Sequence, residues 1–416
     1  MTERSELTTS HHAQPASTWF GLQNAGLWLL AFSGCVVTFE PAPYEIVFLL
    51  VALLFVATGL RLHWSLGPLI VLLAGFAAGG LLANITLMGN SKALTFVVVS
   101  IYLAVTAIVY AAILAEHTGA RLMALRSGYI AGATLASLLA LLGTFDLGGL
   151  GGVLTTYGRA SATFKDPNVL GAFLVPPLAF LLQDMLIGRR YMLLRGMAAL
   201  LITAGIFLSF SRGAWASAAL ACVCIVLLTF LLSGSPRLQA RSLLVAFAGL
   251  CAVIGLVMIV LSVDQIHQLF EMRARLDQSY DVGETGRFGR QLRSLSVLLD
   301  RPNGLGAHQF GIQFGEDPHN VYLNAFFAYG WLGGFSYLLL IFASISVSMR
   351  IMLADWPFRL DAVAVAVPLL TTILQGLQID TDHWRHMFLL LGCVWGLYAA
   401  LLASRRRSGF ATAAPS

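Results

Sequence analysis

Long apolar segments dominate this sequence and restrict the folds open to it. A helix that crosses a bilayer needs about 20 mostly apolar residues, and twelve segments are candidates. We therefore predict an all-α polytopic membrane protein with about twelve transmembrane helices and one large loop that contains short helices. The candidate spans are 21–39, 44–60, 67–86, 93–115, 125–145, 168–186, 192–210, 214–233, 242–263, 329–349, 361–379 and 386–404.

The overall composition supports a membrane protein over a soluble enzyme with an anchor. Of the 416 residues, 58% are hydrophobic and only 11% are charged, whereas soluble domains average about 25% charged residues. The five cysteines all fall in apolar segments, so neither a disulfide framework nor a cysteine metal site is indicated. The first 20 residues are polar, so we expect no cleavable signal peptide.

The placement of arginine predicts the topology. With the N-terminus in the cytoplasm, short loops on the inner side hold most of the arginines, as the positive-inside rule requires. The excess of basic over acidic residues, 25 against 20, is therefore attributed to membrane topology and not to nucleic-acid binding. We expect a disordered cytoplasmic segment at 1–20, a single transmembrane domain at 21–404 and a cytoplasmic tail at 405–416, with the loop 264–320 outside. The inner arginines are Arg4, Arg61, Arg121, Arg126, Arg189, Arg190, Arg195, Arg237, Arg241, Arg350, Arg359 and Arg405 to Arg407.

The outer loop 264–320 contains a predicted amphipathic helix. From Gly286 to Asp300 an apolar stripe recurs at helical spacing, and the arginines lie on the opposite face. One interpretation is an interfacial helix whose arginines contact lipid headgroups. The other is a cationic face turned toward an anionic substrate, which suits the bidentate guanidinium of arginine. The stripe is Phe288, Leu292, Leu295 and Leu299, and the arginines are Arg287, Arg290 and Arg293.

The exit of the same loop resembles a helix start. Asp317 is the expected N-cap and Pro318 the first helical residue, which places His319 in the first turn. The positive end of the helix dipole disfavours an imidazolium there. A neutral imidazole can act as a general base. The alternative is a histidine that only caps or packs at the membrane interface.

Further polar residues gather on the same outer side. Asp166 and Pro167 form a second predicted helix start, adequately explained as a cap, with Arg159 and Lys165 just before it. Arg212 interrupts a long apolar run in a predicted tight turn. A charge so near the hydrocarbon is costly and is a functional candidate by default, the alternative being snorkelling to headgroups.

The last outer loop, 379–386, concentrates polar side chains. Asp380, Asp382, His383, Arg385 and His386 fall within it. The loop is a candidate source of a carboxylate for catalysis. The alternative, a solvated turn, is the one we favour for His386.

Four stretches resemble the O-antigen ligase and Wzy-type polymerase superfamily of bacterial envelope glycosyltransferases. Each motif alone is weak, but their order, spacing and shared outer location form a fairly specific set. They are 163–168 (TFKDPN), 209–213 (SFSRG), 286–287 (GR) with 301–306 (RPNGLG), and 318–323 (PHNVYL) followed by Gly330 and Gly333.

The resemblance implies a metal-independent, inverting transfer of a glycan from an undecaprenyl-diphosphate carrier, with no cofactor. It implies that Arg212 and Arg287 bind the lipid diphosphate and that His319 is catalytic. Positive charge beside a diphosphate leaving group would stabilise the developing negative charge. Further candidates for substrate binding are Arg159, Lys165, Asn168, Arg290 and Asn320.

Several functions remain open. The first is an O-antigen ligase that transfers the glycan to a hydroxyl of lipid A-core on the periplasmic face of the bacterial inner membrane. A polymerase of O-antigen or exopolysaccharide, with a glycan acceptor, is the alternative within the superfamily. A polytopic lipid or solute transporter is the alternative from another class, but it needs polar groups along a path through the membrane. Carboxylates are scarce within the predicted spans.

Overall fold

The computed structural model describes residues 18–274 and 286–412, and nearly all of that part of the chain is helical. The side chains of Arg287, Phe288 and residues 407–412 lie outside the description. Two short strands, β1 (Thr155–Thr156) and β2 (Arg159–Ala160), pair antiparallel. The α-helices are α1 (Thr18–Ser33), α2 (Pro43–Ala57), α3 (Gly67–Ala83), α4 (Ser91–Ala115), α5 (Thr118–Thr144), α6 (Gly151–Leu154), α7 (Pro167–Leu186), α8 (Met192–Leu208), α9 (Arg212–Leu232), α10 (Pro236–Leu261), α11 (Asp264–Ala274), α12 (Arg287–Asp300), α13 (Gln309–Phe314), α14 (Val321–Leu353), α15 (Arg359–Gln375) and α16 (Arg385–Thr412); the 3-10 helices are η1 (Trp64–Leu66), η2 (Ile85–Leu87) and η3 (Leu147–Gly149).

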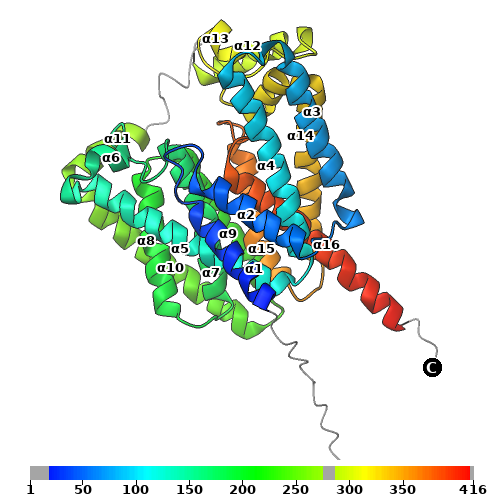
Figure 1. Cartoon of the computed structure of the whole chain (residues 1–416). Helices are drawn as coiled ribbons and strands as arrows, with labels where there is room; N and C mark the ends of the chain where they lie inside the picture. The colour runs from blue at the N-terminus through cyan, green and yellow to red at the C-terminus, as the bar shows by residue number, and fades with distance from the viewer. Residues whose placement is uncertain (1–17, 275–285, 413–416) are drawn as a thin grey trace, which may run out of the picture.

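Every predicted span corresponds to a helix, so the all-α prediction is confirmed. Within the described residues, 8 helices are long and apolar enough to cross a membrane: those that contain α3, α4, α5, α7, α9, α10, α14 and α16. The helices α2 and α8 are apolar but shorter. The total of twelve spans therefore stays a prediction. Figure 1 shows that α1 begins, and α16 ends, at the side of the bundle away from α12 and α13.

Helix packing follows the rules of lipid-embedded proteins. Most of α10 is exposed, including Leu243, Phe247 and Met258, and an apolar surface of this extent suits contact with acyl chains rather than water. Close helix contacts use small residues instead. A Cβ atom added at Gly79 of α3 would lie 2.3 Å from the backbone nitrogen of Gly333 in α14. The α3–α14 crossing therefore depends on a glycine at position 79.

The loop 301–306 forms hydrogen bonds with α14 on both sides of a break in that helix. Gly330 adopts φ 65° and ψ −175° inside the helix, which frees backbone groups on either side. The backbone nitrogens of Leu305 and Gly306 donate to the Phe327 carbonyl at 2.8 and 3.0 Å, and Trp331 donates to the Pro302 carbonyl at 2.8 Å. The RPNGLG motif thus satisfies the polar groups that the break exposes, as a low-dielectric setting requires.

The side chain of Asn84 fastens the same loop to α3. Its amide nitrogen donates to the carbonyls of Gly80 and Ala328 at 2.8 and 2.9 Å, and its oxygen accepts from the Ala307 nitrogen at 2.7 Å. The residue is fully buried. Leaving such partners unsatisfied costs about 1–3 kcal/mol per group, so this asparagine is a structural anchor for the loop.

The predicted helix in the long loop is present as α12. It begins at Arg287 and ends at Asp300, within one residue of the sequence prediction. Leu292, Leu295 and Leu299 of the apolar stripe are exposed, which is what the membrane-interface interpretation expects. On the other side, Trp331 donates from its indole nitrogen to the Leu298 carbonyl at 3.1 Å and joins α12 to α14.

The predicted helix start at Asp317 is wrong. The helix α14 begins at Val321, and Asn320 is its N-cap, with the side-chain oxygen accepting from Tyr322 and Leu323. Asp317 instead accepts a hydrogen bond from the Gly311 nitrogen at 2.9 Å. His319 therefore precedes the helix and adopts a left-handed conformation, φ 48°. Asn320, three positions after Asp317, caps the helix instead, and its side-chain amide also donates to the Leu377 carbonyl.

A buried ion-pair network at the far end of α7 was not foreseen. Arg126 of α5 contacts Asp184 of α7 at 2.6 Å and Asp361 of α15 at 2.5 Å. Arg189 bridges the same two carboxylates, and Arg195 lies 3.3 Å from Asp184. The sequence analysis assigned these arginines to topology alone, yet they join α5, α7, α8 and α15. Replacing Asp184 by a neutral residue would remove a carboxylate that three arginines share, and the loss of a partner in a buried ion pair is destabilising.

Candidate functional site

His319 is held at the entrance to α14 by contacts with two other segments. Gln291 of α12 donates to the carbonyls of Pro318 and His319 at 3.3 and 3.5 Å, and to that of Leu377 at 3.4 Å. The Val321 nitrogen donates to the Gly376 carbonyl at 2.9 Å. The backbone of His319 is thus fixed while 42% of its side chain remains exposed. A fixed, accessible imidazole is suited to proton transfer.

Asp380 faces this imidazole. Its Oδ2 atom lies 3.9 Å from Nδ1 of His319, a distance for charge interaction that is longer than a hydrogen bond. The Oδ1 atom of Asp380 is buried without a hydrogen-bond partner among the described residues. Burial, then the nearby charges of Asp382 and Asp317, raises the pKa of Asp380 to about 8. The outer loop 379–386 therefore places a carboxyl group beside the candidate base.

A second carboxylate–imidazole pair, Asp382 and His383, lies in the same loop 379–386. Asp382 accepts from the Tyr329 hydroxyl at 2.7 Å and lies 3.2 Å from Nδ1 of His383. Nε2 of His383 lies 3.2 Å from the Phe96 carbonyl and from the Ser100 hydroxyl. Burial opposes the ionisation of Asp382, but the charge and hydrogen bond of His383 keep its pKa below the ordinary value. The contacts of this pair join the loop 379–386 to α4 and α14.

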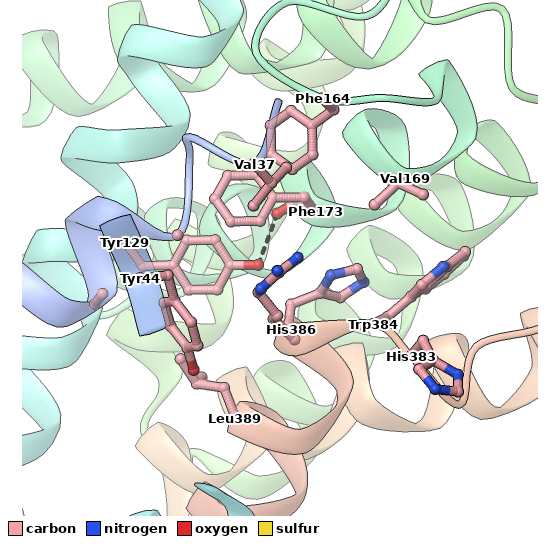
Figure 2. A pocket seen from close by; sticks show the side chains of 13 residues that line it. Val37, Tyr44, Tyr129, Phe164, Val169, Phe173, His383, Trp384, His386 and Leu389 are labelled. Atoms are coloured by element: carbon pink, nitrogen blue, oxygen red, sulfur yellow. Dashed lines mark hydrogen bonds between the residues drawn. The ribbon is translucent and has the colours of Figure 1, made fainter. Parts of the chain in front are cut away.

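The expectation of a solvated turn at His386 is wrong. His386 is 4% exposed and lies within the first turn of α16, against the rings of Trp384 and Phe173. Figure 2 shows these side chains around a small cavity, with the hydroxyl of Tyr129 donating to the Phe173 carbonyl at 2.9 Å. The cavity encloses about 40 Å³, whereas ligand pockets span roughly 300–1,000 Å³. It is therefore too small for a sugar.

The segment 159–168 packs against the turn between α8 and α9. Arg159 donates from Nε to the Ser209 carbonyl and from Nη2 to the Asn168 side chain, both at 2.8 Å. Asp166 is the N-cap of α7, as predicted, and accepts from the Asn168 nitrogen at 2.6 Å. Arg159 is buried, and it joins the turn that precedes Arg212 to the start of α7.

Arg212 is the first residue of α9, and the predicted tight turn is confirmed. Ser211 caps the helix by accepting from the Ala214 nitrogen at 3.3 Å. The next residue, Gly213, lies against the side chain of Gln375, where an added Cβ would be 3.0 Å from Nε2. Gln375 ends α15, and the adjoining Gly376 accepts from Val321, two residues after His319. The Arg212 turn and the His319 segment therefore meet the same end of α15.

The other candidates occupy more varied positions. Lys165 pairs with Glu40 at 2.7 Å in an exposed contact. Arg290 of α12 pairs with Glu316 at 2.7 Å, close to His319 along the chain. Asn320 caps α14 and fastens it to Leu377. The side chain of Arg287 lies outside the described residues, although its backbone begins α12.

Two contributors were not singled out by sequence reasoning. The sequence analysis named Asp380 only as one of several polar residues in the loop 379–386. The structure shows that Asp380 lies beside His319. Gln291 is uncharged and adjoins Arg290, so it carried no signal of its own. Its side chain donates to the carbonyls of Pro318, His319 and Leu377. The sequence does not show that these residues lie beside α12.

These observations define a multi-pass, all-α membrane protein with a cationic and histidine-bearing cluster at the ends of several helices. Residues 197–338 match the family model described as O-Antigen ligase, so the chain carries an O-antigen ligase-type segment and the resemblance drawn from its motifs is confirmed. The matched segment covers about a third of the chain and includes Arg212, Arg287 and His319. At the level of the family it indicates a glycosyltransferase-type enzyme. No curated protein matches the chain.

Proposed function

We propose that this protein transfers a glycan from an undecaprenyl-diphosphate carrier to a sugar hydroxyl, at the periplasmic face of the bacterial inner membrane. The reaction is of the O-antigen ligase type, with lipid A-core as the acceptor. The single observation that carries the proposal is the meeting of the Arg212 turn and the His319 segment at the end of α15. Both lie inside the segment that matches the family.

In the proposed reaction, His319 is the general base. It takes the proton of the acceptor hydroxyl as the oxygen attacks the anomeric carbon of the donor sugar. The bond between that carbon and the diphosphate oxygen breaks, and its electron pair leaves with the diphosphate. Attack opposite the leaving group inverts the anomeric centre. The reaction consumes no oxidant or reductant.

Arg212 and Arg287 are the proposed diphosphate ligands. A guanidinium binds phosphate oxygens bidentately, and fixed positive charge stabilises the negative charge that develops on the leaving group. Arg212 begins α9, so the positive end of that helix dipole also favours an anion nearby. The proposal needs no metal ion for the leaving group.

Asp380 is the proposed partner of His319. A carboxylate beside an imidazole stabilises the imidazolium that forms when the base takes a proton. A positive charge on the imidazole would in turn favour the ionised form of the neighbouring carboxyl group. Their separation of 3.9 Å is compatible with this role, because catalytic contacts often tighten only when substrate is bound.

The membrane orientation belongs to the same proposal. Arginine placement puts both termini in the cytoplasm and the loop 264–320 in the periplasm. In Figure 1 the beginning of α1 and the end of α16 both lie away from α12 and α13. This arrangement is consistent with both ends facing the same side of the membrane. The proposed domain organisation keeps 21–404 as one transmembrane domain, and α16 extends the last helix to Thr412.

The acceptor distinguishes a ligase from a polymerase and is tested by deletion of the gene. If the protein is the ligase, lipopolysaccharide from the deletion strain will lack all O-antigen on a gel. A single retained repeat would identify a polymerase of O-antigen. An unchanged gel with lost exopolysaccharide would identify the exopolysaccharide polymerase. A strain that loses no envelope glycan would contradict the proposed enzyme.

Asp380→Asn is expected to lower the rate of glycan transfer about tenfold and to change its dependence on pH. In the unaltered protein the rate will rise as the pH increases toward about 8, because Asp380 loses its proton there and its carboxylate then stabilises protonated His319. The asparagine variant will lack this rise. Initial rates measured with a lipid-linked donor between pH 6 and about 9 test the prediction.

The matched control is Asp300→Asn, which removes an exposed carboxylate at the end of α12, in the loop that carries His319. It is expected to keep the rate and the pH profile. Folding must be measured separately, because the raised pKa of Asp380 makes the native state less stable as pH rises from about 4 to about 8; the folded protein then holds a proton that the unfolded chain has lost. An Asp380→Asn profile identical to that of the unaltered protein would refute the assigned role.

A further inference from the structure

A second polar site lies between the beginning of α1 and the junction of α4 with α5. It encloses about 690 Å³, within the roughly 300–1,000 Å³ range of small-molecule pockets. The beginning of α1 lies at the side of the bundle away from α12 and α13 (Figure 1). The site is therefore separate from the proposed transfer site. Its walls come from α1, the end of α2 with the following turn, and the α4–α5 junction, with Trp19, Gln23, Thr58, Arg61, Glu116 and Arg121 among the lining residues.

Arg121 supplies a buried cation to this cavity. Its side chain is 6% exposed, and Nη1 donates to the carbonyls of Ile113 and Glu116 at 2.6 and 3.0 Å. The guanidinium also lies over the Phe55 ring, 5.0 Å from its centroid. Nε is buried without a hydrogen-bond partner, and Arg121 forms no ion pair among the described residues. The carboxylate of Glu116, which lines the same cavity, offsets part of this charge. An incompletely paired buried charge is still costly, so the site favours an anionic ligand.

The other charged groups of the cavity leave it positive. Arg61 lines the mouth and is exposed. One carboxylate, that of Glu116, also lines the cavity, and it lies 3.7 Å from Nε2 of His63, beyond hydrogen-bond distance. Gln23 and Thr58, hydrogen-bonded to each other at 2.7 Å, add uncharged polar groups to the wall. Two guanidinium groups around a polar cavity match the donor geometry that phosphate oxygens require.

The surroundings of the cavity indicate a lipid rather than a soluble anion. Trp19 lines the cavity and is 60% exposed, and exposed tryptophan is typical of the membrane–water interface. The adjoining surface of α2 exposes a row of apolar side chains: Ile46, Leu49, Leu50, Leu53 and Val56. Acyl chains can lie along this row while a headgroup occupies the cavity. Basic pockets between helices bind anionic lipid headgroups in this way.

We propose that this cavity binds the phosphodiester headgroup of an anionic phospholipid through Arg121 and Arg61, with the acyl chains along α2. This site is independent of the glycan transfer proposed above. The test uses the full-length protein in detergent and native mass spectrometry to count retained lipid. The probes are phosphatidylglycerol and phosphatidylcholine with identical acyl chains, each at the same ratio to protein. Phosphatidylglycerol is expected to be retained at least fivefold more strongly.

Arg61→Gln removes an exposed charge from the mouth of the cavity, and exposed substitutions usually change stability little. It is expected to weaken phosphatidylglycerol retention about fivefold, which corresponds to about 1 kcal/mol for one arginine at a lipid headgroup. Arg237→Gln, an exposed arginine at the start of α10, is the matched control and is expected to change nothing. Arg121→Lys tests the buried group with its charge kept, and it is expected to lose retention through the lost planar fork.

Three outcomes would overturn the proposal. Equal retention of the two lipids would remove the anionic preference, and equal losses in Arg61→Gln and Arg237→Gln would remove the site. Glycerol 3-phosphate and inorganic phosphate distinguish the two sources of a phosphate group. If either displaces phosphatidylglycerol at equal concentration, the cavity takes a soluble anion and not a lipid. None of these measurements depends on glycosyltransferase activity, so failure here leaves the proposed function untouched.

Discussion

His319→Ala is expected to lower glycan transfer by about 10²- to 10⁴-fold, the usual contribution of a positioned general base. The substitution removes the imidazole that faces Asp380, while Gln291 still holds the backbone carbonyls of residues 318 and 319. Alanine also lacks hydrogen-bonding capacity, so no substitute base remains at this position. The measurement is the initial rate of transfer from a lipid-linked donor in isolated membranes, normalised to the amount of inserted protein.

His267→Ala is the matched control for this experiment. His267 lies on α11 of the same loop, is exposed and contacts Glu271 at 3.2 Å. Its loss is expected to leave the rate within about twofold, as is normal for an exposed surface position. Because residue 319 has φ 48°, His319→Asn is a useful second variant, since asparagine tolerates this conformation better than alanine. Full activity in both residue-319 variants would show that His319 is not the base.

Helix positions were predictable from the sequence because they depend on local hydrophobicity. The predicted segment 168–186 became α7 (Pro167–Leu186), and Asp166 capped it as its chemistry required. The segment 329–349 became part of α14 (Val321–Leu353), which joins it to the helix predicted to start at Pro318. This helix continues past a break at Gly330, where the loop 301–306 supplies hydrogen bonds from outside. These hydrogen bonds come from a separate loop, so the hydropathy of the helix itself does not predict that the helix continues past the break.

The same reasoning explains which parts of the site were foreseen. Arg159 and Asn168 are nine positions apart and share one outer segment, so their proximity follows from local connectivity. The approach of Asp380 to His319 joins two loops separated by α14 and α15. Sequence reasoning identified both polar clusters but not the pairing, because nothing in composition or spacing specifies which loops meet. The roles of these residues in catalysis remain predictions.

Arg212→Ala is expected to lower kcat/KM for the diphosphate-linked donor about 10²- to 10³-fold, the usual cost of removing one donor that stabilises developing negative charge. Arg212→Lys keeps the charge but loses the bidentate fork, so it should fall between alanine and the unaltered protein. The measurement is kcat/KM over a range of donor concentrations, together with binding of the donor in the absence of acceptor.

Two controls separate the role of Arg212 in donor binding from a role in folding. The first residue of a helix does not supply the N-cap, which Ser211 provides here, so Arg212→Ala should leave α9 intact and the melting temperature nearly unchanged. Arg237→Ala, which removes an exposed arginine from the start of α10, should leave kcat/KM unchanged. If Arg212→Ala binds the donor normally and loses rate only with unfolding, the arginine supports the turn and does not bind diphosphate. If binding falls while the fold persists, and lysine restores part of it, the positive charge at the end of α15 is what holds the leaving group.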